Sequence, residues 1–120
     1  MKIANSTAKI GEDLAVKFLE KKGYTIIERN FRRHYGEIDI IALFNQTLVF
    51  IEVKTRKTNK FGTPFEAITP WKLNEVIKTA IYYKSIHLKL PELLRVDAIS
   101  ICLKPDNKID KIEHVENISL

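Results

Sequence analysis

The stretch GEIDIIALFNQTLVFIEVKTR, residues 36–56, predicts a β-hairpin from which the rest of the fold can be built. Both of its arms are rich in β-branched and aromatic residues, and Asn45-Gln46 between them forms a two-residue turn. Counting outward from that turn along an antiparallel pair places Asp39 directly opposite Glu52. The register therefore predicts two facing carboxylates in the middle of a sheet.

Both faces of this hairpin have the composition of buried surface. One face is wholly apolar and carries Ile38, Ile40, Ala42, Val49, Ile51 and Val53. The other carries Asp39 and Glu52, with Glu37 opposite Lys54 at one end and Ile41, Leu43, Leu48 and Phe50 at the other. Opposed like charges destabilise a sheet, and a buried unpaired carboxylate is costlier than an exposed one. We therefore expect a cation between Asp39 and Glu52.

Two kinds of cation fit that position. In a purely structural ion-pair cluster the positive charge comes from Lys54 or Arg95. A divalent metal ion instead takes the all-oxygen shell that Mg²⁺ prefers, made of both carboxylates, a neighbouring main-chain carbonyl such as that of Val53, and waters. The residues by themselves leave both alternatives open.

A metal ion at this position would suit hydrolysis of a phosphodiester. In that hypothesis Asp39 and Glu52 hold Mg²⁺ or Mn²⁺, and Lys54 orients the attacking water or offsets the developing charge. Glu12, which helical spacing places at the edge of a buried helix face, completes the shell or holds a second ion.

Around the hairpin, the chain reads as a single α/β domain over residues 1–120, in the order αβββαββ. The other predicted elements are a helix from Ser6 to Lys22, a strand from Tyr24 to Phe31, a helix from Pro70 to about Lys84, and strands Leu94 to Leu103 and Ile109 to Val115. Alternation of this kind predicts one mixed sheet flanked by helices. No signal peptide or membrane span is recognisable, and the lone Cys102 suits a cytoplasmic protein with no membrane partner.

The charge balance points to an anionic partner. The net charge is +5, and the whole excess lies in residues 1–60, which hold 12 basic and 7 acidic side chains. Solvated loop charge is one interpretation, and a nucleic-acid backbone lying across the basic loops is the other. The residues that we expect to contact the nucleic-acid backbone are Arg32, Arg33, Thr55, Arg56, Lys57, Lys60 and Lys72.

The hairpin also resembles a known family. Its Gly36-Glu37-Ile38-Asp39 and Glu52-Val53-Lys54 segments look like the catalytic hairpin of the PD-(D/E)xK nucleases. With Gly11-Glu12, Thr69-Pro70 and Arg95-Val96-Asp97, the chain is similar to the YraN-type family of small bacterial proteins.

The resemblance implies a restriction-endonuclease-like fold near the Holliday junction resolvases, which are Mg²⁺-dependent dimers that cut branched DNA. A homodimer and branched DNA are therefore candidate partners. Asp39, Glu52 and Lys54 match the catalytic positions, and Glu12 matches the helix carboxylate. The alternatives are a nucleic-acid-binding module that keeps this fold without cutting, and a protein-interaction domain with a structural charge cluster.

Trp71 opens the second predicted helix. Packing, capping and base stacking each account for a tryptophan there.

Overall fold

A computed structural model describes residues 6–34, 36–57 and 68–119 and confirms the α/β class and element order. The helices are α1 (Ser6–Lys21) and α3 (Pro70–Ser85). The strands are β1 (Thr25–Arg33), β2 (Gly36–Phe44), β3 (Thr47–Arg56), β4 (Leu93–Leu103) and β5 (Ile109–Val115). These bounds differ from the expected ones by at most two residues, because apolar periodicity defines the middle of an element better than its ends.

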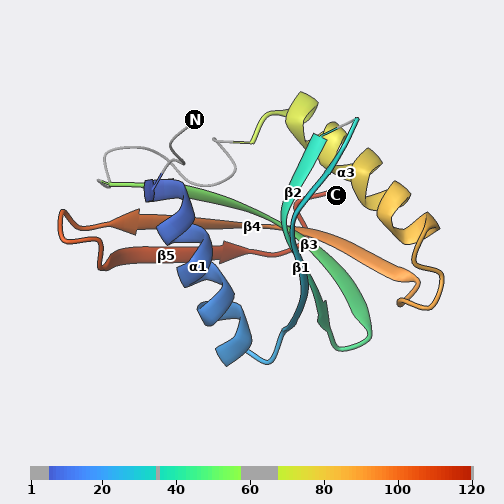
Figure 1. Ribbon diagram of the computed structural model, residues 1–120, viewed down its shortest axis with the longest axis horizontal. Helices are drawn as coiled ribbons and strands as arrows, with labels where there is room; N and C mark the ends of the chain where they lie inside the picture. The colour runs from blue at the N-terminus through green and yellow to red at the C-terminus, as the bar shows by residue number, and fades with distance from the viewer. Residues whose placement is uncertain (1–5, 35, 58–67, 120) are drawn as a thin grey trace.

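The strands form one twisted sheet in the order β1-β2-β3-β4-β5 (Figure 1). All neighbours are antiparallel except β3 and β4, which run parallel. Helix α3 lies between these two strands in the chain, as a parallel connection requires. Figure 1 shows α1 crossing one face of the sheet and α3 lying on its right-hand side. Neither described helix is long and apolar enough to cross a membrane.

The turn of the central hairpin has the predicted geometry. Asn45 and Gln46 both have positive φ, 47° and 63°, which is typical of a type I′ turn. The pairing runs from Phe44 with Thr47 to Ile40 with Ile51, as counting from the turn predicted. Apolar burial then follows the two faces, with one core cluster beneath α1 and another beneath α3.

One residue of the predicted apolar face lies on the wrong side. Ile38 and its cross-strand partner Phe31 pack beneath α3, whereas Ile40, opposite Arg29, packs beneath α1. Asn30, between these pairs, has a φ of 54° in the left-handed region. The alternation of sides is thus interrupted next to Asn30, whereas a count of residues assumes it to be regular.

Helix α1 approaches the sheet most closely at Gly11. A Cβ atom on Gly11 would lie 1.9 Å from Oγ1 and 2.7 Å from Cβ of Thr55 in β3. These distances are far below van der Waals contact, so only glycine lets the helix backbone pack at this depth. The same approach brings Glu12, the next residue, to the sheet.

Gly11→Ala should therefore destabilise the protein by about 1–3 kcal/mol, because the added methyl group must push α1 away from β3. Chemical denaturation monitored by circular dichroism would measure the change. Lys17→Ala, on the exposed side of the same helix, is the matched control and should change stability by less than about 0.5 kcal/mol. A stabilised Gly11→Ala, which alanine gives at open helix positions, would contradict the close contact.

Candidate functional site

Asp39 lies where the regular pairing of β2 with β3 ends. Among the described residues of the two strands, the ladder stops at Ile40 and Ile51. Beyond this pair, the main-chain N–H of Val53 donates to Oδ2 of Asp39 over 2.8 Å. The expected pairing of Asp39 with Glu52 is therefore not a continuation of the ladder. Instead, the Asp39 carboxylate accepts the hydrogen bond that a partner strand would otherwise take.

Glu52 is the more deeply buried of the two acids. Only 5% of the residue is exposed, and its Oε2 atom is buried with no hydrogen-bond partner. Its Oε1 atom lies 3.9 Å from Nζ of Lys72, in the first turn of α3. A buried carboxylate oxygen without a partner is uncommon in folded proteins and needs an explanation such as a bound ion.

The surroundings of both acids favour their protonated forms. Burial raises the pKa of Glu52 to about 8; the charge of Asp39 adds to the increase and Lys72 opposes it. Burial likewise raises the pKa of Asp39 to about 6, against the hydrogen bond from Val53 and with the help of the charge of Glu12. When both acids are ionised, the site therefore carries more negative charge than its described protein neighbours neutralise.

Lys72 supplies the positive charge that sequence reasoning assigned to Lys54 or Arg95. That assignment is wrong for Arg95, whose guanidinium binds Asp97 through Nε and Nη2 at 2.9 and 3.0 Å. Lys54 is partly buried two residues beyond Glu52 and shares its side of β3. The signal for Lys72 was its position in the first turn of a helix, where the dipole disfavours a cation unless a carboxylate faces it.

Glu12 comes from α1 and is already engaged. Its Oε1 accepts from Nη2 of Arg29 at 2.8 Å, and its Oε2 accepts from Nδ2 of Asn30 at 2.9 Å. The charge of Glu12 still raises the pKa of Asp39. Arg29, which belonged to the basic stretch expected to face an anionic partner, instead holds Glu12 and Asp13.

The site around Asp39 and Glu52 meets the requirements of a divalent cation only in part. Nowhere in residues 6–34, 36–57 and 68–119 do three His, Cys, Asp or Glu side chains converge as a ready metal-binding group. The unpartnered Oε2 of Glu52 and the raised pKa values of both acids nevertheless fit a cation held by Asp39 and Glu52. Oxygen donors from two carboxylates, completed by a carbonyl and waters, are a normal Mg²⁺ shell.

The residues predicted to contact a nucleic-acid backbone lie in different parts of the structure. Arg32 and Arg33 lie on the β1–β2 hairpin, where Arg32 pairs with Glu37 at 3.5 Å. Lys57 donates to Asn107 in the turn before β5. The other four differ in their surroundings: Thr55 packs on Gly11, Arg56 is partly buried, Lys72 faces Glu52, and Lys60 lies outside the described residues.

Asp97 shows how this fold neutralises a buried acid fully. It is 0% exposed and accepts from Arg95, from Nε2 of His114 at 2.8 Å and from the main-chain N–H of Asn117 at 2.9 Å. Although burial opposes ionisation, these hydrogen bonds hold the pKa of Asp97 below its usual range. Asp97 thus anchors β5 and the following segment to β4.

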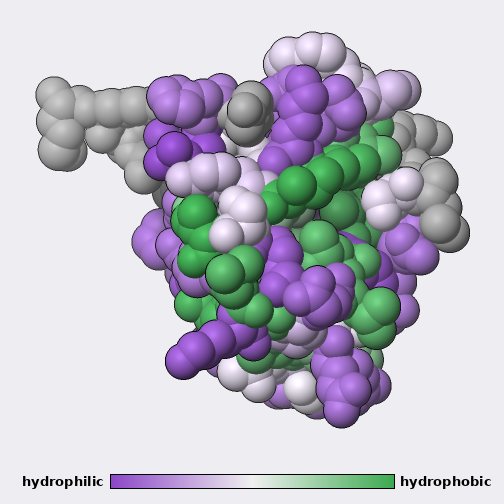
Figure 2. Space-filling model, turned by 90° about the vertical axis from the view of Figure 1, so that its right-hand side faces the viewer, coloured by the Kyte–Doolittle hydropathy of each residue, from purple (hydrophilic) through white to green (hydrophobic). Residues whose placement is uncertain are grey.

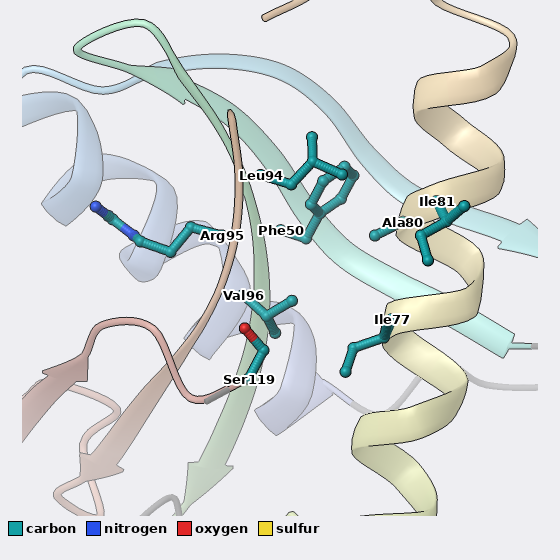
Figure 3. A pocket seen from close by; sticks show the side chains of 8 residues that line it. All are labelled: Phe50, Ile77, Ala80, Ile81, Leu94, Arg95, Val96 and Ser119. Atoms are coloured by element: carbon teal, nitrogen blue, oxygen red, sulfur yellow. The ribbon is translucent and has the colours of Figure 1, made fainter. Parts of the chain in front are cut away.

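A groove of about 290 Å³ lies between α3 and the sheet (Figure 3). Its lining is almost wholly apolar and consists of Phe50, Ile77, Ala80, Ile81, Leu94 and Val96, with Arg95 and Ser119 at its edge. In Figure 3 the Arg95 side chain points away from these apolar groups. Because none of Asp39, Glu52 and Lys54 lines it, the groove is separate from the carboxylates.

Comparison with known proteins shows the lineage of the chain. The model of the uncharacterised protein family UPF0102 matches residues 11–101, which include Glu12, Asp39, Glu52, Lys54 and Lys72. This chain belongs to the UPF0102 family. A UPF0102 protein of Syntrophomonas wolfei is 46% identical over 89% of this chain and 91% of its own length.

Other UPF0102 relatives are similarly close. The relative from Geotalea daltonii is 44% identical over 91% of this chain and 85% of its own length. A relative from Clostridium perfringens is 48% identical over 76% of this chain and 75% of its own. The family expected from the hairpin motifs, the YraN-type proteins, is thereby confirmed, and the family description assigns no activity.

Glu52→Gln should change how the stability of the protein depends on pH. Burial raises the folded-state pKa of Glu52 from 4.5 to about 8, so the folded protein binds this proton more tightly than the unfolded chain. That contribution to stability is complete below the unfolded pKa and is lost as pH rises toward 8. With EDTA present, the variant should be about 1–3 kcal/mol more stable than the parent at pH 8 and show a shallower decline.

Denaturation curves across this pH range would measure both quantities. Glu20→Gln, at an exposed position of α1, is the matched control and should follow the parent. If Glu52→Gln were less stable than the parent at pH 8, Glu52 and Lys72 would form a stabilising ion pair. The excess negative charge inferred for the site would then be wrong.

Proposed function

We propose that this protein is a metal-dependent nuclease that hydrolyses phosphodiester bonds of DNA. The observation that carries the proposal is a pair of acids with raised pKa values, the partly buried Asp39 and the buried Glu52, of which Glu52 keeps an unpartnered carboxylate oxygen. A fold that needed these groups only for stability would neutralise them as it does Asp97. Acids whose charge the protein does not compensate are instead typical of ligand-binding and catalytic sites.

In this proposal, Asp39 and Glu52 hold Mg²⁺ or Mn²⁺ together with the Val53 carbonyl. The ion, when bound, acts as a Lewis acid toward the phosphate and offsets negative charge that develops during hydrolysis. Lys54 shares the Glu52 side of β3 and orients the attacking water or stabilises the leaving oxygen. With an ion bound by Glu52, Lys72 would contact a phosphate of the strand in place of this carboxylate.

Branched DNA is the substrate that we would test first. The resemblance to the junction resolvases motivates it, and the net charge of +5 suits a polyanion. Arg33 on the β1–β2 hairpin is exposed, and this hairpin approaches α3 where Gly36 lies against Glu75. Because Arg33 also lies over the Tyr82 ring of α3, it would contact a strand that runs along this helix.

A second candidate function is nucleic-acid binding without cleavage. The state of Glu12 favours it, because this carboxylate is held by Arg29 and Asn30 rather than directed toward an ion. Such a module would keep the charged surface and the fold. It would have no use for the unpartnered oxygen of Glu52, which is why we place it second.

A cleavage assay separates the two functions. The protein is incubated with linear duplex, single-stranded and four-way-junction DNA in Mg²⁺, Mn²⁺ or EDTA. We expect cleavage that requires the metal and falls at least about 100-fold in Glu52→Gln, since the ion loses a charged ligand. Glu20→Gln is the control and should cut like the parent.

Cleavage that survives EDTA, or that Glu52→Gln retains in full, would refute the proposed site. Binding of DNA with no cleavage under any of these conditions would favour the non-catalytic module. Gel electrophoresis of end-labelled strands reports both cutting and its position.

A further inference from the structure

Trp71 is the only tryptophan of the chain and is largely exposed to solvent. It is the second residue of α3, and 71% of it is exposed. Capping does not account for it, because Thr69 caps the helix by accepting from the N–H of Lys72 at 3.0 Å. Packing does not account for it either, since so exposed a side chain buries little apolar area. A large exposed apolar residue of this kind is informative about binding.

The position of Trp71 connects it to the candidate site. Lys72, the next residue, reaches to 3.9 Å from Oε1 of Glu52. Successive side chains of a helix diverge by about 100°, so Lys72 faces Glu52 while Trp71, one residue earlier, points to the solvent next to it. A ligand that reached the carboxylates past the start of α3 would pass the indole ring.

The solvent face of α3 continues from Trp71 with groups that suit a nucleic-acid strand. Tyr82 lies eleven residues further along, three turns away on the same face and roughly 16 Å distant. The Arg33 guanidinium from the β1–β2 hairpin lies 4.4 Å from the Tyr82 ring. Lys78 lies on this face between them, and Glu75, one turn after Trp71, packs near Gly36. Figure 2 shows this side of the molecule, where apolar and hydrophilic surface interleave.

We infer that Trp71 stacks on an unpaired nucleobase of a strand that lies across the Asp39–Glu52 site. This inference rests on the proposed function for the position of the strand, but it adds the recognition of unpaired bases. An aromatic ring flanked by cations binds single strands because every base presents a π-face while lysine and arginine meet the phosphates. Along a duplex each internal base is stacked between its neighbours, so the indole finds no free base face there.

Charge favours a nucleic acid over a protein as the occupant. Lys72 follows Trp71 in the chain, Lys78 lies two turns along the same helix face and Arg33 lies over Tyr82 at the far end of that face, whereas Glu75 is the single acid of α3. An apolar protein partner would more readily use the groove between α3 and the sheet, which is lined by apolar side chains.

The single tryptophan makes the test direct. The full chain in EDTA, where no metal-dependent cleavage proceeds, is titrated with a thymidine 20-mer, with a blunt duplex of equal length and with inorganic polyphosphate. We expect saturable quenching of tryptophan fluorescence by the single strand only. In anisotropy measurements with labelled DNA, Trp71→Ala should weaken single-strand binding about 5- to 150-fold and leave duplex binding within about twofold.

Two variants control the measurement. Trp71→Phe keeps an aromatic face and should retain most of the single-strand affinity. Leu88→Ala removes another highly exposed apolar side chain, 78% exposed and beyond the end of α3, and should bind like the parent. Unchanged thermal melting of all three would show that the fold is intact.

Several outcomes would overturn the inference. Equal weakening for single strand and duplex in Trp71→Ala, or quenching by polyphosphate alone, would show that charge and not stacking governs binding. Quenching that depends on protein concentration without DNA would assign Trp71 to contact between two copies.

The inference and the proposed function fail separately. If the parent cuts DNA with Mg²⁺ while Trp71→Ala binds single strands as well as the parent does, the nuclease stands and the stacking is wrong. If no metal supports cleavage but the quenching and the affinity loss are found, the stacking stands on a binding module.

Discussion

The hydrogen bond from the Val53 N–H to the Asp39 carboxylate is the contact on which the site depends. A buried main-chain N–H needs an acceptor. The pairing of β2 with β3 ends at Ile40 and Ile51, so the main chain of β2 offers no acceptor to the N–H of Val53. The side chain of Asp39 fills that role and is thereby drawn toward β3. The Asp39 carboxylate then lies near Glu52. Side chains alternate along β3, so Glu52 points to the side of the sheet that α3 covers. The site is thus a consequence of how the central hairpin stops pairing.

The two helices act on these acids with opposite sign. Glu12 of α1 raises the pKa of Asp39, whereas Lys72 of α3 lowers the pKa of both Asp39 and Glu52. Each helix reaches the site for a local reason. The absence of a side chain at Gly11 lets α1 lie close to β3. Thr69 and Pro70 begin α3 at a point where Lys72, in its first turn, faces Glu52. The fold places a negative and a positive group on either side of an acid pair that remains undercompensated.

Asp97, in the same sheet, shows that a buried acid of this protein can be fully neutralised. Asp97 is buried as deeply as any residue, yet Arg95, His114 and a main-chain N–H satisfy it, and its pKa falls. Glu52 is nearly as buried, keeps an oxygen with no partner, and its pKa rises. The same chain therefore contains one acid whose charge its neighbours compensate and a pair of acids whose charge they leave partly uncompensated.

The sequence by itself determined the element order, the turn at Asn45-Gln46 and the pairing of β2 with β3 up to Ile40, because apolar periodicity and turn chemistry are local. It also marked Asp39 and Glu52, since charges inside apolar strands stand out without any structure. Only the tertiary structure decided that the ladder ends before these acids, that Ile38 changes sides, and that Lys72 rather than Arg95 faces Glu52. Those outcomes depend on sheet twist and on which helix packs over which strand, and such long-range packing leaves no periodic trace along the chain.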